Sequence, residues 1–312
     1  MLPTILYALA FLLLAILVLY LFFPRLLFDR ARRALRSRAG VRPQTISVDG
    51  VNWPYLEGGN AAGPPLVLVH GFGGDKDNWV FYAPLLKSEY RLIFPDMPGF
   101  GDSIRDVALN YDIKTQAARL RSFLDAVGID RCHLGGNSMG GCIALRFAID
   151  FPDRLSSLTL FNNAGVLGTD DSELQALFDA DPTANPLVPA NLADLDRLMG
   201  FIAVNPRPIP GQFKKIMYDD FVANRALLDK IFHGMAEELL NNPMNDELGK
   251  VRAPTLIIWG RQDRLIDVTC AEVQHAGIKN SQLAIFENVG HIPMIEDPAA
   301  CAAVHRPFLA SH

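Results

Sequence analysis

The chain passes from an apolar run into an amphipathic pattern at Leu134-Gly135-Gly136-Asn137-Ser138-Met139-Gly140-Gly141, which contains a G-x-S-x-G motif centred on Ser138. This context is typical of a nucleophile elbow, a sharp turn between a strand and a helix that carries a serine at its tip. A side chain on either flanking glycine, Gly136 or Gly140, would collide with neighbouring backbone. The stretch therefore predicts Ser138 as a nucleophile that a strand and a helix hold in a strained turn.

A serine nucleophile needs a base to accept its proton, and the base needs a carboxylate to orient it. An apolar run at 255–260 predicts a buried strand, and Asp263 follows its end. A second run at 282–286 predicts the next strand, and His291 follows it. We therefore predict the catalytic group Ser138, Asp263 and His291. Asp267 is the alternative acid, although it could equally cap the following helix.

The other polar residues near predicted strand ends have structural interpretations. Among the histidines, only His291 directly follows a late strand. We expect His70 to support the loop that it begins, and His133 to lie at the start of a strand. Asp96, within a loop rich in proline and glycine, is interpreted as a turn residue.

An acyl-transfer site also needs backbone N–H groups directed at the developing oxyanion. The run at 66–70 predicts a strand that ends in the glycine-rich loop Gly71-Phe72-Gly73-Gly74. We assign the two donors as the backbone amides of Phe72 and Met139.

At this point the sequence resembles the α/β-hydrolase superfamily over nearly all of residues 46–312, and the order Ser138, Asp263, His291 is the order found in that family. The segments that carry the resemblance are His70-Gly71-Phe72, Asp77-Asn78-Trp79, Asp96-Met97-Pro98-Gly99, Ser138-Met139-Gly140-Gly141, Ile258-Trp259-Gly260-Arg261-Gln262-Asp263 and Glu287-Asn288-Val289-Gly290-His291.

More closely, the chain resembles the membrane-anchored monoacylglycerol lipases and related bacterial lipases and phospholipases A. This implies hydrolysis of carboxylic esters of lipids, with monoacylglycerols, lysophospholipids or phospholipids as substrates. Asn137 before the serine is also similar to the C–C bond hydrolases of ring-cleavage products, which form the alternative. A non-enzymatic membrane scaffold is the third hypothesis. Epoxide hydrolases and haloalkane dehalogenases share the fold but use an aspartate nucleophile, so Ser138 argues against both.

Alternation of strand and helix patterns predicts the fold class. Apolar strands are expected at 66–70, 91–95, 133–136, 158–161, 255–260 and 282–286, with helices at 113–127 and 139–150 and a hairpin around Asp49-Gly50. This alternation indicates an α/β fold with a mainly parallel central sheet and helices on both faces. We expect the α/β-hydrolase core to comprise residues 45–164 and 251–312.

The interval 165–250 breaks this rhythm and is rich in proline and helical pattern, which predicts an inserted helical lid. Its apolar side chains could line an acyl pocket or form the lid's own core. They are Phe178, Leu198, Met199, Phe201, Ile202, Phe213, Ile216, Met217 and Phe221.

Residues 1–24 carry no charged side chain, and the apolar run 5–23 would be about 28 Å long as a helix, close to the roughly 30 Å of a bilayer's hydrocarbon. We predict a retained transmembrane anchor at 1–24, followed by a basic juxtamembrane segment at 25–44 that meets anionic headgroups. That segment has seven arginines and one acid up to residue 42. Positive charge directly after the span favours a cytoplasmic catalytic domain, with a periplasmic location as the alternative.

From residue 43 onward the chain has 22 basic and 33 acidic side chains, a net charge of −11 that makes nucleic acid an unfavourable partner. The four cysteines, Cys132, Cys142, Cys270 and Cys301, show no C-x-x-C spacing, so free thiols are expected. No metal-ligand or phosphate-loop motif is present, and no cofactor is predicted. The anchor has no G-x-x-x-G motif, so the sequence leaves homo-oligomerisation open.

Overall fold

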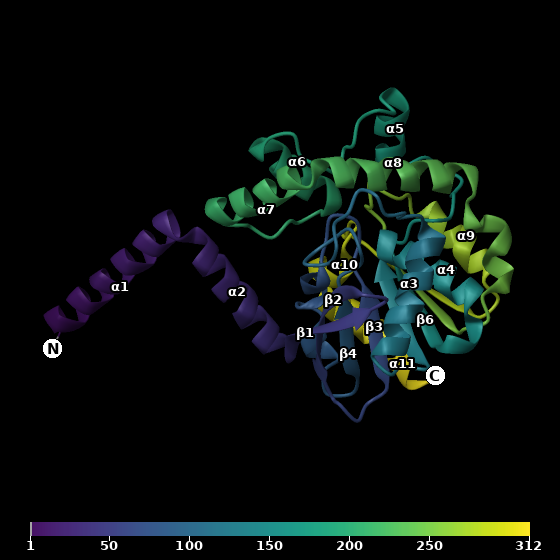
Figure 1. Ribbon diagram of the computed structural model, residues 1–312, viewed down its shortest axis with the longest axis horizontal. Coiled ribbons are helices and arrows are strands. Elements are labelled where there is room, and N and C mark those ends of the chain that lie inside the picture. Colours follow the sequence, from purple (N-terminus) through teal and green to yellow (C-terminus); the bar gives the residue numbers. More distant parts are fainter. Residues whose placement is uncertain (1) are drawn as a thin grey trace.

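The computed structural model describes residues 2–312, and its centre is one eight-stranded sheet with the strand order β1-β2-β4-β3-β5-β6-β7-β8 (Figure 1). The strands are β1 Val41–Val48, β2 Val51–Gly59, β3 Pro65–Val69, β4 Arg91–Pro95, β5 Cys132–Asn137, β6 Leu155–Phe161, β7 Thr255–Gly260 and β8 Ser281–Phe286. All six strands predicted from apolar runs are present; β4 and β7 have the predicted bounds, and the bounds of the other four differ by at most three residues.

The sheet is mainly parallel, as predicted. Strands β4, β3, β5, β6, β7 and β8 run parallel to one another, whereas β1 pairs with β2, and β2 with β4, in the antiparallel sense. The predicted hairpin joins β1 to β2 through Asp49 and Gly50, whose φ angles of 51° and 80° are both left-handed. Two left-handed residues match the right-handed twist of paired strands.

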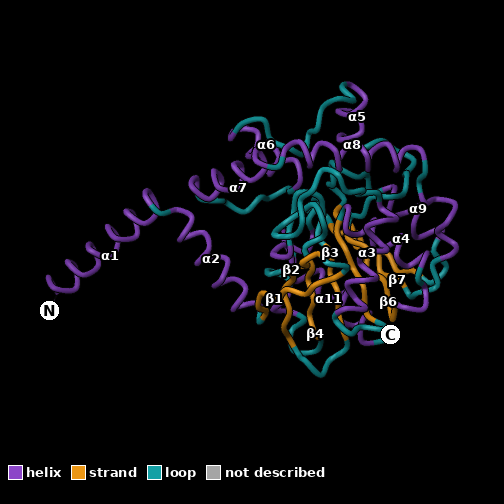
Figure 2. The backbone as a smooth tube through the Cα atoms, viewed as in Figure 1, coloured by secondary structure: helices purple, strands orange, loops and turns teal. Residues whose placement is uncertain are grey.

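The central strands are buried on both faces. In β3, Leu66 and Leu68 belong to one hydrophobic cluster, while Val67 and Val69 belong to a second cluster on the opposite face. This division follows from the two-residue period of a strand, which turns successive side chains to opposite faces. Helices enclose the strands on both sides (Figure 2), so the predicted layered α/β architecture is confirmed.

Helices α3, α4 and α9 pack on the Val67 side, and α10 and α11 pack on the Leu66 side. The α-helices are α1 Leu2–Phe22, α2 Pro24–Ala39, α3 Ile113–Ala126, α4 Met139–Asp150, α5 Glu173–Ala180, α6 Leu192–Ile202, α7 Gly211–Ala223, α8 Arg225–Asn241, α9 Thr269–Gly277, α10 Pro293–Glu296 and α11 Pro298–Ala310. Short 3₁₀ helices are η1 Lys76–Trp79, η2 Ala83–Leu85, η3 Pro152–Arg154 and η4 Met244–Lys250.

The segment between β6 and β7 contains helices α5 to α8, which lie together on one side of the molecule (Figure 1). We call these four helices the insertion. Its proline-rich loop, residues 203–210, joins α6 to α7. A helix-rich segment is what the sequence predicts for residues 165–250.

Helices α1 and α2 extend away from the sheet and meet at a bend near Phe23 (Figure 1). The stretch Thr4–Phe22 in α1 has the length and composition needed to cross a membrane, with a mean hydropathy of 2.9. Strand β1 begins at Val41, inside the segment predicted as juxtamembrane, because Gly40 ends α2 in a left-handed conformation with φ 74°. The basic segment is therefore mostly helical.

Candidate active site

Ser138 lies on the turn between β5 and α4, with φ 56° and ψ −121°. A positive φ is costly for a residue with a Cβ atom, and such strain is concentrated at functional sites. The two glycines of the motif allow the turn to close. A Cβ on Gly136 would lie 2.2 Å from the carbonyl oxygen of Gly140, and one on Gly140 would lie 2.4 Å from that of His70. The G-x-S-x-G pattern is thus explained by backbone packing.

Asp263 and His291 lie side by side at the carboxyl ends of β7 and β8. His291 Nδ1 is 2.7 Å from Asp263 Oδ2, and both side chains are almost completely buried. Asp267, the alternative acid, accepts hydrogen bonds from the backbone N–H and the hydroxyl of Thr269 at the start of α9. The tertiary structure therefore brings Asp263, not Asp267, to the imidazole.

Three further donors hold the Asp263 carboxylate. Its Oδ1 accepts the backbone amides of Leu265 at 2.8 Å and Ile266 at 3.1 Å. Its Oδ2 accepts Asn162 Nδ2 at 2.6 Å, and this is the oxygen that faces His291. Sequence reasoning missed Asn162. The available signal was its position directly after β6, at the sheet edge where Asp263 and His291 also lie.

The elbow and the histidine loop are joined directly. Asn137 Nδ2, from the residue before the serine, donates to the backbone oxygen of His291 at 3.0 Å and to that of Phe161 at 3.0 Å. The backbone amide of His291 in turn donates to the carbonyl of Ile202 at the end of α6, at 2.8 Å. The loop that carries the imidazole is thus fixed between the elbow and the insertion.

The loop after β3 lies against the serine, because a Cβ on Gly71 would be 3.2 Å from Ser138 Cβ. His70 anchors this loop as expected. Its Nδ1 donates to Gly71 O at 2.8 Å, and its Nε2 accepts the amide of Met97 at 3.1 Å. Burial lowers the pKa of His70, which keeps the ring neutral.

The amides of Phe72 and Met139 were predicted as oxyanion donors. Within residues 2–312, neither amide donates a hydrogen bond to a protein acceptor. Met139 is also the first residue of α4, where the helix dipole favours negative charge. Both amides are therefore free to bind a developing oxyanion.

Two other polar residues have structural roles: His133 lies at the start of a strand as expected, whereas Asp96 belongs to a buried ion pair rather than to a turn. Asp96 is fully buried and accepts the amides of Lys76 at 2.7 Å and Asp102 at 2.8 Å, and it pairs with the Lys76 ammonium. His133 is the second residue of β5 and bonds Ser157 Oγ at 2.8 Å.

Aromatic side chains of the insertion reach the loop after β3. Phe232 of α8 lies edge-on to Phe72 with ring centroids 6.0 Å apart, and Phe178 of α5 packs on Phe232. Phe100 flanks Phe72 from the core side. Neither Phe100 nor Phe232 was among the residues proposed from sequence. Phe213, which was proposed, instead packs against Phe28 of α2 at 5.3 Å.

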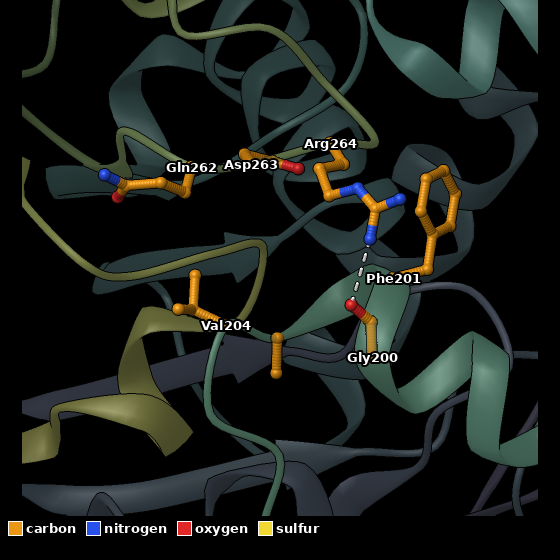
Figure 3. Close-up of a pocket in the computed structure, with 7 residues that line it drawn as sticks. Gly200, Phe201, Val204, Gln262, Asp263 and Arg264 are labelled. Carbon is orange, nitrogen blue, oxygen red and sulfur yellow. Dashed lines mark hydrogen bonds between the residues drawn. The ribbon is translucent and has the colours of Figure 1, made fainter.

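A cavity of about 440 Å³ opens beside the acid rather than the serine (Figure 3). It lies between the end of α6 and the loop after β7, where Arg264 donates to Gly200 O at 3.2 Å and lies over the Phe201 ring. Its lining consists of Gly200, Phe201, Ala203, Val204, Gln262, Asp263 and Arg264. Because Ser138 is not in this lining, the cavity is not assigned to the reacting ester.

All four cysteines are buried and free, as expected, and burial raises the pKa of each thiol. Over the described residues no cluster of histidine, cysteine, aspartate and glutamate side chains is arranged to hold a metal ion.

Comparison with known proteins gives consistent relatives. A family model described as the alpha/beta hydrolase fold matches residues 64–298. Lipase 3 of Moraxella sp. (strain TA144) is 32% identical over 88% of this chain and 86% of its own length. Monoacylglycerol lipase abhd6-B of Xenopus laevis is 30% identical over 96% of this chain and 91% of its own length.

Among solved structures, a bacterial membrane phospholipase A has a TM-score of 0.88 and 39% identity, with 100% of this chain and 99% of that chain covered. The similarity thus includes the N-terminal helices as well as the sheet. The sheet order, the serine elbow and these matches show that this chain belongs to the α/β-hydrolase family.

Proposed function

We propose that this protein is a membrane-anchored serine hydrolase that cleaves carboxylic esters of lipids through an acyl-enzyme on Ser138. Its similarity to the α/β-hydrolase family and to lipases shows that the chain is a carboxylic ester hydrolase. The observation that carries the proposal is the hydrogen bond of 2.7 Å between His291 Nδ1 and Asp263 Oδ2. Asn137 connects the loop of His291 to the strained turn of Ser138 by a hydrogen bond.

The chemistry follows from these positions. Ser138 Oγ attacks the acyl carbonyl while His291 Nε2 takes the hydroxyl proton. Asp263 accepts a hydrogen bond from the Nδ1–H group of His291 and stabilises the imidazolium that forms. The Phe72 and Met139 amides bind the oxyanion, and His291 then protonates the departing alcohol. A water molecule then gives a proton to His291 and attacks the acyl-enzyme, and His291 returns that proton to Ser138 Oγ as the acyl–oxygen bond breaks and the carboxylic acid leaves.

A lipid substrate is supported by both the relatives and the surroundings of the serine. Two similar proteins are named lipases and one is named a phospholipase A. The rings of Phe72, Phe100, Phe178 and Phe232 form an apolar wall beside the proposed oxyanion donors. Such a wall can cover an acyl chain, for which each buried CH₂ contributes about 0.8 kcal/mol. Monoacylglycerols, lysophospholipids and phospholipids are the proposed substrates.

The domain division is part of the proposal. Residues 1–24 act as a transmembrane anchor, 25–44 as a basic connector, 45–164 and 251–312 as the catalytic core, and 165–250 as a lid over the serine. Support for the anchor comes from the exposed apolar surface of α1 and from the stretch Thr4–Phe22, whose 19 residues are long and apolar enough to cross a membrane. Partners are the lipid substrate and membrane lipids.

One activity panel tests the substrate class. The full-length protein in detergent is given monoacylglycerol, lysophospholipid, phospholipid and a ring-cleavage dienoate, with Ser138→Ala as the matched control. We expect hydrolysis of at least one lipid ester, and none by the variant. Turnover of the dienoate alone would replace the proposal with the C–C hydrolase alternative.

A further inference from the structure

The basic helix α2 uses two of its arginines inside the protein. Arg32 donates to both Asp75, at 2.9 Å, and Asp77, while Arg36 donates two hydrogen bonds to Asp77, at 2.6 and 2.7 Å. Residues 32 and 36 are one helical turn apart, so both guanidinium groups lie on the same face of α2. Arg30 and Arg33, on the same helix, are exposed. The segment predicted to bind headgroups therefore has a second, inward-facing surface.

The two aspartates belong to the loop that carries the proposed oxyanion donor. Asp75 caps η1 by accepting the amide of Asp77 at 2.8 Å, and Gly74 closes the preceding turn by donating to Gly71 O at 3.1 Å. Phe72 lies inside that turn. Only two residues, Gly73 and Gly74, therefore lie between Phe72 and Asp75, the nearer of the two carboxylates that Arg32 holds.

The same loop is fixed on its other side by a buried ion pair. Lys76 lies between the two aspartates in sequence, yet its ammonium pairs with Asp96 in the interior. Asp96 directly precedes Met97, whose backbone amide donates to His70 Nε2. On its other side the same ring donates from Nδ1 to the carbonyl oxygen of Gly71. Two hydrogen bonds through His70 thus connect Met97, the residue after Asp96, to the peptide that presents the Phe72 amide.

The electrostatics show why the arginines are needed. The carboxylates of Asp75 and Asp77 lie close to each other. Burial of Asp75 and, secondly, the negative charge of Asp77 raise the pKa of Asp75 to about 6. Without cations, two such carboxylates repel each other. Arg32 and Arg36 supply the positive charge that offsets this repulsion. Both arginines lie outside residues 64–298, the range that the family model matches.

We propose that Arg32 and Arg36 of α2 are positioning residues for catalysis, which hold the loop 71–79 so that the Phe72 amide faces the oxyanion. The proposal rests on the role proposed above for Phe72. The juxtamembrane helix is then a component of the active site's support as well as a connector to the membrane.

The test compares two full-length variants that lose the same charge. Arg32→Gln/Arg36→Gln removes the inward-facing pair, and Arg30→Gln/Arg33→Gln removes an exposed pair. For each we would measure kcat and KM on a short soluble ester, the rate at which a fluorophosphonate labels Ser138, and the Ki of a trifluoromethyl ketone, whose adduct places an oxyanion between the two amides.

We expect kcat and the labelling rate of Arg32→Gln/Arg36→Gln to fall about tenfold and Ki to rise by a similar factor. This effect is smaller than the roughly 10²- to 10³-fold loss of kcat that follows removal of a whole oxyanion donor. The KM of this variant should stay within about twofold, because only stabilisation of the transition state is reduced. The exposed-face control should match wild type. Equal kcat, labelling and Ki in the two variants would overturn the proposal.

A milder variant covers the case in which the double change does not fold. Arg36→Lys keeps the charge but loses the two-point contact with Asp77, since an ammonium cannot donate as a planar fork. It should raise Ki by a few fold at unchanged KM, and an unchanged Ki would count against the proposal. Failure of the wild type to label at Ser138 would instead refute the serine mechanism itself, so the two failures are distinguishable.

Discussion

Asn162 donates its side-chain amide to Asp263 Oδ2 at 2.6 Å, the same carboxylate oxygen that faces His291 Nδ1. Asn162 itself has φ 43°, a left-handed conformation that is uncommon for a residue with a side chain. Its Oδ1 also accepts the amide of Gly260 at the end of β7, at 3.3 Å. One side chain therefore ties the end of β6 to the acid on the next strand.

We expect Asn162→Ala to reduce kcat by about tenfold, since hydrogen-bonded partners that orient a reacting group contribute one to two orders of magnitude. The carboxylate would keep its two backbone donors, so Ser138 should still be labelled, more slowly. Steady-state kinetics on a soluble ester measures the effect. If kcat is unchanged while thermal stability falls, Asn162 is only a packing residue.

Ser138→Ala and His291→Ala should each abolish ester hydrolysis in a protein that remains folded by circular dichroism. Asp263→Asn should also be severe, because the imidazole then loses its orienting acceptor. Asp267→Asn serves as the matched control, since that carboxylate accepts hydrogen bonds from Thr269 at the start of α9 and not from His291. Near-wild-type turnover by Ser138→Ala, or greater damage from Asp267→Asn than from Asp263→Asn, would show that the assignment is wrong.

Removal of residues 1–24 should separate membrane access from chemistry. The truncated protein keeps Arg32 and Arg36, so hydrolysis of a short soluble ester should stay within a few fold of the full-length value. Hydrolysis of long-chain lipid in vesicles should fall much further, because transfer of an acyl chain through water costs about 0.8 kcal/mol per CH₂. Equal losses in both assays would indicate that α1 stabilises the fold, and no loss in either would argue against a membrane lipid as substrate.

The charge distribution predicts the orientation of the anchor. Seven arginines follow the span directly, whereas residues 1–24 carry no charged side chain, and this asymmetry favours an external N-terminus and a catalytic domain on the cytoplasmic side. Protease added to intact spheroplasts should therefore leave the catalytic domain undigested, with lysed cells as the positive control. Digestion from outside would establish the periplasmic alternative.

Stability should fall as the pH decreases below neutrality. Burial lowers the pKa of His305 to about 3 and that of His133 to about 4, against about 6.5 in an unfolded chain. Between those values the unfolded state binds more protons, so each residue contributes a slope of up to about 1.4 kcal/mol per pH unit, with stability lost as pH falls. The ring of His305 is fully buried between the hydroxyl groups of Tyr82 and Thr159, each 2.9 Å from a ring nitrogen, so a charge on it would be removed from water.

The measurement is the free energy of unfolding in urea between pH 7 and pH 4.5. Other groups also titrate in this range, so the comparison is between wild type and His305→Gln. The variant should be less stable at pH 7 but show a shallower decline. Parallel declines would mean that His305 does not contribute.

The sequence by itself determined the features that depend on local backbone geometry and periodicity. The apolar runs predicted six strands because burial on both faces requires an uninterrupted apolar segment. The Asp49-Gly50 pair predicted its hairpin, and the glycines around Ser138 predicted the elbow, because each turn admits few residue types. The order of Ser138, Asp263 and His291 at strand ends was likewise readable along the chain.

Only the tertiary structure decided which distant side chains meet. It brought Asp263 rather than Asp267 to His291, since the position of a carboxylate after a strand depends on the loop path and not on sequence spacing. It also joined Asn162 to Asp263 across two strands, and Arg36 to Asp77 across 41 residues. Such contacts have no local periodic signature, because they arise when packing of the whole sheet and its helices fixes the relative positions of segments that are independent in the sequence.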